Sequence, residues 1–282
     1  MRIDAHQHFW DLERFEYPWM PPPPSPLAFS FLPQHLRPIL KRNKFDGSVA
    51  VQAKASMEET AWLLDLASEN DFILGVVAWV DLTDPRLGTT LDRLQRHPKF
   101  KGVRHPVHDE PAVNWVVRDD VLRGFRELAT RGLPYDLLFR PPHLPLIPRI
   151  AERAPELRMV IDHLAKPPIG SGKLDGWAED LVRAAEHPQV YCKLSGMITE
   201  ASPQWTADEL KPFVRHAFEV FGADRLMFGS DWPVCLLACE TWKVTLAAFT
   251  QAHGALPLEV RNKVIGETAQ RFYGLKAPRS DS

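Results

Sequence analysis

The chain has 282 residues, of which 45% are hydrophobic and 25% charged, and its formal net charge is -2. This composition is ordinary for a folded globular protein, and the near balance of charges gives no reason to expect nucleic acid or an acidic membrane as a partner. No apolar run reaches the length of a membrane span, and the N-terminus lacks the basic region and apolar core of a secretory signal.

The sequence contains three cysteines, Cys192, Cys235 and Cys239. An odd and sparse set is poor material for a disulfide framework and is typical of a reducing environment, so we expect a cytoplasmic protein. Cys235 and Cys239 resemble half of a metal site, but no second pair completes it. We therefore interpret both as packing residues.

The first predicted element is a short strand, 3–8, which ends in two histidines two positions apart. Because side chains alternate between the faces of a strand, His6 and His8 point the same way. Two imidazoles on one face make a site for a metal ion, a proton or a carbonyl oxygen. The alternative is a pair of surface histidines near a mobile terminus.

Residues 9–33 are predicted to form one long loop. Its proline-rich run, 21–26, is stiff and extended, but too few residues precede it for a domain linker. We expect the loop to fold over something because it carries six aromatic residues, Trp10, Phe15, Tyr17, Trp19, Phe29 and Phe31. Two interpretations stay open, a cover over a functional site and a contact with a neighbouring subunit.

After the loop, short apolar runs alternate with helical patterns. Strands are predicted at 48–51, 74–80, 101–103, 135–139, 159–161, 190–192 and 225–228. Helix starts are predicted at the capping boxes Ser56/Glu59 and Thr206/Glu209, at Asp84-Pro85, at Asp120, and near Ile147 and Trp177. The last two helices are predicted at 241–252 and 258–273, with Gly274 as the C-cap.

This alternation of eight strands with helices predicts an α/β protein with a parallel sheet. A doubly wound open sheet usually has a glycine-rich turn after its first strand, and no such turn occurs here. Eight units in about 280 residues favour a (β/α)8 TIM barrel. We expect a single domain over residues 1–275, followed by a flexible tail, 276–282.

In such a barrel the chemistry lies at the C-terminal ends of the strands. Polar or ionisable residues follow almost every predicted strand, and they include His6, His8, Gln52, Arg104, Arg140, His163, Lys193 and Asp231. Taken singly, each has an ordinary alternative as a helix cap, a salt-bridge partner or a solvated loop residue. Taken together, they predict an active site at one rim of the barrel.

Three motifs appear in order along the chain: Asp4-Ala5-His6-Gln7-His8 first, Asp162-His163-Leu164-Ala165-Lys166-Pro167 after the sixth strand, and Gly229-Ser230-Asp231-Trp232-Pro233 after the eighth. They resemble the amidohydrolase superfamily, and in particular its sugar-acid lactonase branch, which includes L-fuconolactonases, L-rhamnonolactonases and pyrone-dicarboxylate lactonases. The resemblance spans almost the whole chain and implies a distorted, amidohydrolase-like barrel.

The resemblance also implies roles for the site residues. Asp231 would be the general base that takes a proton from water, and His6, His8 and His163 would surround the substrate carbonyl or one divalent metal ion. Arg104, Lys193 and Arg140 would bind the carboxylate or hydroxyls of the substrate. Two further residues complete the expected substrate-binding set, Gln52 and Trp232. For Trp232, stacking on a sugar ring and core packing both stay open.

The metal requirement is also left open. Binuclear members of the superfamily use a carboxylated lysine or a glutamate after strand four, where this chain has Arg104 and His105. Mononuclear members usually have a histidine after strand five, where it has Arg140. One zinc or manganese ion held by His6, His8 and Asp231, with or without His163, is therefore one alternative, and catalysis without metal is the other.

These observations predict an enzyme that hydrolyses the lactone of a sugar acid or a related carboxylated lactone, with Asp231 activating the water. One alternative is a metal-dependent amidohydrolase or decarboxylase of the same superfamily. A barrel that only binds a sugar acid is disfavoured, because the histidines and Asp231 occur together. The expected partner is a small-molecule lactone, and the choice between monomer and dimer stays open.

Overall fold

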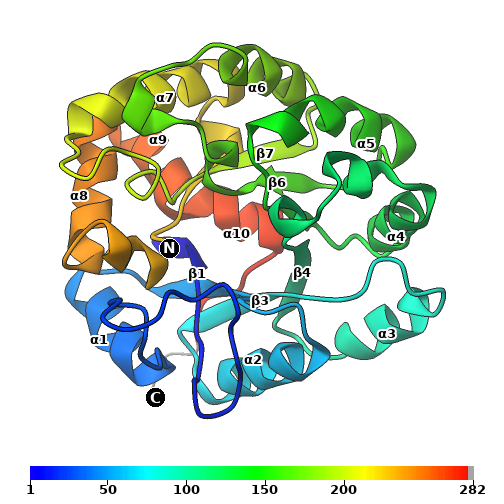
Figure 1. Ribbon diagram of the computed structural model, residues 1–282. Coiled ribbons are helices and arrows are strands. Elements are labelled where there is room, and N and C mark those ends of the chain that lie inside the picture. The colour runs from blue at the N-terminus through cyan, green and yellow to red at the C-terminus, as the bar shows by residue number, and fades with distance from the viewer. Residues whose placement is uncertain (279–282) are drawn as a thin grey trace.

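The computed structural model describes residues 1–278 and has eight parallel strands enclosed by helices (Figure 1). Each strand pairs with the next one along the chain, so the order in space follows the order in sequence. The strands are β1 (Ile3–Gln7), β2 (Gly47–Val51), β3 (Ile73–Ala78), β4 (Phe100–His105), β5 (Tyr135–Leu137), β6 (Met159–Ile161), β7 (Val190–Leu194) and β8 (Leu226–Phe228). The predicted (β/α)8 barrel is therefore confirmed.

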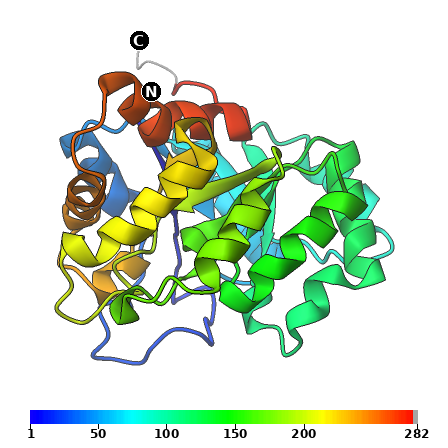
Figure 2. The same ribbon diagram turned by 90° about the horizontal axis from the view of Figure 1, so that it is seen from above.

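Helices pack along the outside of the strands, as the view from above makes clear (Figure 2). They are α1 (Pro33–Arg42), α2 (Met57–Glu69), α3 (Leu87–Leu94), α4 (Asp119–Thr130), α5 (Ile147–Arg153), α6 (Trp177–Ala185), α7 (Ala207–Phe221), α8 (Trp242–His253), α9 (Leu258–Asn262) and α10 (Thr268–Tyr273). Within the described part of the chain, no helix is long and apolar enough to cross a membrane.

Three details of the helices differ from the sequence prediction. Helix α1 was not predicted, and it buries Leu36 and Leu40 although Pro38 lies inside it. Helix α4 begins at Asp119, with Arg118 at the N-cap, so Asp120 lies in the first turn, where its carboxylate pairs with the Arg118 guanidinium. The predicted helix 258–273 is two short helices joined by a π-helical turn, 263–267.

Closure of the barrel between β1 and β8 depends on a few hydrogen bonds at the ends of the strands. His8 N–H donates to the Trp232 carbonyl at 2.7 Å, and Asp231 N–H donates to the His6 carbonyl at 2.9 Å. The fully buried Asp4 carboxylate accepts from the backbone N–H of Ser230 at 2.8 Å and from its hydroxyl at 2.6 Å. Trp242 Nε1–H, from α8, donates to the same carboxylate at 2.9 Å.

The loop 9–33 is anchored by its own aromatic residues. Trp10 and Phe31 exchange two backbone hydrogen bonds of 3.0 and 2.9 Å, which close the loop at its base. Trp10 is completely buried, whereas Trp19 and Phe29 are exposed over 41% and 66% of their surface. The Phe31 ring packs on Trp232, with ring centroids 5.2 Å apart, so the loop lies against the end of the barrel that follows β8.

We expect Asp4→Ala to lower the free energy of unfolding by about 2–5 kcal/mol, because it leaves buried donors of Ser230 and Trp242 without an acceptor. Chemical denaturation of the variant and the native protein measures this difference. Asp4→Asn keeps one acceptor oxygen in the same place and should lose less. Equal stability of Asp4→Ala and the native protein would contradict this account of barrel closure.

Candidate active site

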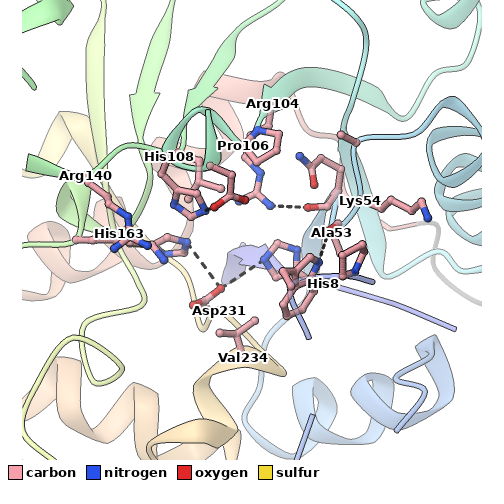
Figure 3. Close-up of a pocket in the computed structure, with 17 residues that line it drawn as sticks. His8, Ala53, Lys54, Arg104, Pro106, His108, Arg140, His163, Asp231 and Val234 are labelled. Atoms are coloured by element: carbon pink, nitrogen blue, oxygen red, sulfur yellow. Dashed lines mark hydrogen bonds and ion pairs between the residues drawn. The ribbon is translucent and has the colours of Figure 1, made fainter. Parts of the chain in front are cut away.

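A cavity of about 770 Å³ opens where the C-terminal ends of the strands meet (Figure 3). Its lining includes six of the residues predicted from the sequence: His8, Gln52, Arg104, Arg140, His163 and Asp231. Cationic and aromatic residues also line it, among them Trp19, Lys54, His108 and Lys166. The polar rim expected from the alternating pattern is therefore one continuous surface.

Three imidazoles converge on one carboxylate at the floor of the cavity. His8 Nε2 lies 3.4 Å from Asp231 Oδ1, and the Nε2 atoms of His6 and His163 each lie 3.8 Å from the same oxygen. His6 Nε2 and His8 Nε2 are 3.2 Å apart. All four side chains are buried, His6 completely.

The second nitrogen of each imidazole is held by the surrounding protein. His8 Nδ1 lies 2.8 Å from the carbonyl oxygen of Val51, which can only accept, so His8 carries its proton on Nδ1. His163 Nδ1 lies 2.8 Å from Ser195 Oγ, and His6 Nδ1 lies 3.3 Å from Asp162 Oδ1. The His8 Nε2 lone pair therefore faces both His6 Nε2 and the Asp231 carboxylate.

These four side chains fit a single divalent ion. Ligand bonds of about 2.0–2.1 Å in a tetrahedral site place ligand atoms roughly 3.4 Å apart. The separations from Asp231 Oδ1 to the three nitrogens, 3.4 to 3.8 Å, and the 3.2 Å between His6 Nε2 and His8 Nε2 are close to that spacing. His6, His163 and Asp231 offer ligand atoms that all lie within 4.8 Å of one another.

Burial sets the protonation of the cluster. It lowers the pKa of His6 and His8 below the ordinary value of 6.5, and that of His163 to about 4. Burial alone would raise the pKa of Asp231, but the influence of His163 and the contact with His8 outweigh it and lower that pKa. At neutral pH the imidazoles are uncharged and Asp231 is ionised, the states in which these groups bind metals or accept protons.

Unusual backbone conformations aim His163 and Asp231 at each other. Residues 163–166 all have positive φ between 53° and 58°, and Asp231 has a φ of 57°. Such conformations are costly for residues other than glycine and cluster at functional sites. Gly196 lies against the His163 ring, where a Cβ atom would be 2.6 Å from Nδ1.

Arg104 lies at the cavity as predicted, but its guanidinium is largely committed to the protein. Nη1 donates to Asp162 Oδ2 at 3.1 Å and lies 3.3 Å from His6 Nε2, and Nη2 donates to the carbonyl of Gln52. Only 4% of Arg104 is exposed. Its charge is thus balanced by Asp162 before any substrate binds.

Two residues expected to bind substrate do not line the cavity. The prediction ended the seventh strand at Cys192, but β7 continues to Leu194, so Lys193 is inside the strand and its side chain lies in the barrel interior. Trp232 is 2% exposed and packs edge-on against Phe9 and Phe31, which supports the core-packing interpretation.

Two buried acids lie beneath the cavity: Asp136, which sequence reasoning missed, and Asp162, which it named in the motif after the sixth strand but gave no role. Lys193 Nζ lies 2.5 Å from Asp136 Oδ2 and 3.0 Å from Asp162 Oδ1. The hydroxyl of Tyr273 in α10 lies within 2.9 Å of both oxygens of Asp136. A carboxylate in the middle of an apolar strand, as in 135–139, was a usable signal, because buried charges are almost always paired.

One wall of the cavity is formed by two distant segments. Trp19 Nε1–H donates to the Ala53 carbonyl at 2.8 Å, and Lys54 Nζ donates to the Glu16 carbonyl at 2.7 Å. The Glu59 carboxylate, in α2, accepts from Ala53 N–H at 3.0 Å and Lys54 N–H at 2.8 Å. The predicted capping box of Ser56 and Glu59 is present only in part. Ser56 Oγ accepts from Glu59 N–H, but the Glu59 carboxylate bonds to Ala53 and Lys54 instead of to Ser56 N–H.

Glu59→Gln should change the pH dependence of stability. Burial raises the pKa of Glu59 from 4.5 to about 7, so between these values the unfolded state holds fewer protons and the native protein loses stability as pH rises. The variant lacks this loss, so its stability relative to the native protein should rise by roughly 2–3 kcal/mol from pH 4.5 to pH 7. Denaturation at several pH values measures it, and parallel profiles for the two proteins would contradict it.

Comparison with known proteins adds independent information. The model of the amidohydrolase family matches residues 3–275. The chain is 39% identical to an L-fucono-1,5-lactonase of Burkholderia ambifaria, over 99% of this chain and 98% of that protein. It is 37% identical to an L-fucono-1,5-lactonase of Burkholderia multivorans, over 99% and 97% of the two chains. A crystal structure of an amidohydrolase from Burkholderia multivorans with bound zinc superimposes with a TM-score of 0.90 at 36% identity, over 98% of this chain and 100% of that one.

Proposed function

Because the chain belongs to the amidohydrolase family, we propose that it is a hydrolase that opens the lactone ring of a sugar acid with water. The relatives named as L-fucono-1,5-lactonases, which match at 39% and 37% identity over nearly their whole length, support this class of cyclic ester. The observation that carries the proposal is the ionised Asp231 among three uncharged imidazoles at the floor of the cavity.

Asp231 acts as the general base in this proposal. Its carboxylate lines the cavity and is ionised at neutral pH, so it can accept the proton of a water molecule that attacks the lactone carbonyl. The same carboxyl group can return the proton to the ring oxygen as the ester bond breaks. Its backbone conformation, fixed by the bond from Asp231 N–H to the His6 carbonyl, keeps the carboxylate aimed at the floor.

The imidazoles of His6, His8 and His163, with Asp231, would hold one divalent ion, zinc or manganese. A bound ion supplies Lewis acidity toward the lactone carbonyl oxygen. The alternative without metal rests on Arg104, whose Nη1 lies 3.3 Å from His6 Nε2 and can donate a hydrogen bond to it. In that case hydrogen-bond donors at the floor would stabilise the developing oxyanion.

Substrate contacts are assigned to the upper part of the cavity. Gln52 is 2% exposed, and its Nε2 has no hydrogen-bond partner among residues 1–278, so a substrate hydroxyl would satisfy it. Arg140 is exposed at the rim, where it can bind the carboxylate of the opened product. The indole of Trp19 lines the cavity and is suited to stacking on a sugar ring.

The proposed setting follows from the same observations. The substrate is a small molecule, and the three free cysteines favour a reducing, cytoplasmic location. A sugar-acid lactone is small enough to fit a cavity of this size, and we propose no nucleic acid or membrane as a partner.

Asp231→Asn is expected to lower lactone hydrolysis by about 10²–10⁴-fold, because the amide cannot accept the proton of the attacking water. Asparagine tolerates positive φ well, so the fold should survive, as circular dichroism and thermal unfolding can show. Steady-state rates on an aldonolactone measure the effect. A native-like rate in the folded variant would exclude Asp231 as the base.

The substrate class and the metal requirement can be tested together with a panel of fucono-, rhamnono-, galactono-, xylono- and arabinono-lactones. Proton release is followed with a pH indicator, with and without a chelator. We expect hydrolysis that the chelator abolishes and that zinc or manganese restores, because three uncharged imidazoles face one another. Hydrolysis that survives chelation supports the metal-free alternative, and no hydrolysis of any lactone favours a decarboxylase or another amidohydrolase.

A further inference from the structure

Beneath the floor of the cavity lies a second cluster that the proposed reaction does not use directly. The ammonium of Lys193 is surrounded by Asp136 Oδ2 at 2.5 Å, Asp162 Oδ1 at 3.0 Å and His6 Nδ1 at 3.1 Å. It also lies 5.6 Å from the centre of the Tyr273 ring. Lys193, both carboxylates and His6 are completely buried.

The groups around Lys193 are those that would bind a metal ion. His6, Asp136 and Asp162 offer ligand atoms within 4.8 Å of one another, so they have the chemistry and the spacing of a divalent site. The Lys193 nitrogen lies within 3.1 Å of an atom of each of them. The same three groups therefore cannot bind an ion while the lysine is in place.

The charges of the cluster balance without an ion. Asp136 pairs with Lys193, and Asp162 pairs with both Lys193 and Arg104, the latter at 3.1 Å. Two carboxylates thus face two cations in the barrel interior. A divalent ion added beside Lys193 would bring an excess of positive charge into a buried site, which is costly.

We propose that the Lys193 ammonium is a built-in cation that occupies the place of a second divalent ion and fixes His6 from below by direct contact with Nδ1. Lys193 and Arg104 hold the Asp162 carboxylate from two sides, and the Lys193 ammonium can also donate to His6 Nδ1, which lies 3.1 Å away. Lys193 is thus a positioning residue and keeps the site restricted to one ion.

The first test counts ions and does not depend on lactone hydrolysis. Lys193→Ala removes the cation and opens space between Asp136, Asp162 and His6. After equilibration with zinc sulfate and dialysis, this variant should retain one zinc ion per chain more than the native protein, as elemental analysis measures. Its melting temperature should also rise on zinc addition by more than that of the native protein.

Three controls separate the cluster from general effects of the substitution. Lys193→Met fills the space without charge and should not gain an ion. Lys193→Ala with Asp136→Asn lacks one ligand and should also gain none. Lys173→Met changes an exposed lysine in the same way and should match the native protein in both measurements. A folded Lys193→Ala variant with the native zinc content and no added stabilisation by zinc would overturn the proposal.

The second test concerns His6, and this arm alone rests on the proposed metal site. Lys193→Met with Asp136→Asn keeps the interior neutral, since Asp162 still pairs with Arg104. Losing the lysine that contacts His6 Nδ1 should weaken zinc binding at the upper site by about 10- to 100-fold, as competition with a chromogenic chelator measures. Unchanged zinc affinity in this variant would exclude the positioning role, even where Lys193→Ala fails to fold. If the native protein binds no zinc, the proposed metal site fails while the ion count in Lys193→Ala still decides the first arm.

Discussion

The seam between β1 and β8 is the constraint on which the site depends. His6 in β1 and His8 just after it are separated from Asp231 by more than two hundred residues, and they meet Asp231 only because the first and last strands close the barrel. The hydrogen bonds that make this closure run through the site itself, from Asp231 N–H to the His6 carbonyl and from His8 N–H to the Trp232 carbonyl. Asp4, which lies two residues before His6, joins the same two segments by accepting two hydrogen bonds from Ser230. Folding and assembly of the catalytic cluster are therefore one event.

Much of this arrangement could be predicted from local patterns. Apolar runs separated by amphipathic helices are enough to indicate the barrel, and the barrel rule then places His8, Gln52, Arg104, Arg140, His163 and Asp231 at one rim. Contacts between distant residues could not be predicted in this way. The predicted strand ended at Cys192, which would place Lys193 just beyond it, at the rim of the barrel. In the structure Lys193 lies inside β7, and its side chain lies in the interior. Hydrophobicity alone does not locate a strand end to within one residue. The wall formed by Trp19 and Ala53 depends on a loop whose path no periodic pattern describes.

The buried charges of the barrel form two levels with different roles. The upper level has one carboxylate and three uncharged imidazoles, so its net charge is negative and it can bind a cation. The lower level has Asp136 and Asp162 against Lys193 and Arg104, and it is already neutral. His6 belongs to both, since Nε2 faces Asp231 and Nδ1 faces Asp162. Because the lower level is already neutral, an added positive charge, from an ion or a proton, is more stable at the upper level, which the substrate can reach.

The wall built by the loop 9–33 separates two tasks within the molecule. The loop has a small core of its own, formed by Trp10, Tyr17 and Leu27, and it touches the cavity through Pro18 and Trp19. Two of its contacts with the β2–α2 connection are hydrogen bonds in which a side chain, of Trp19 or Lys54, donates to a main-chain carbonyl. Changes within the loop can therefore alter which ring fits above Asp231 while the strands that carry the chemistry stay as they are. Barrels of this kind that act on different substrates would then differ in sequence more in this loop than in the strands.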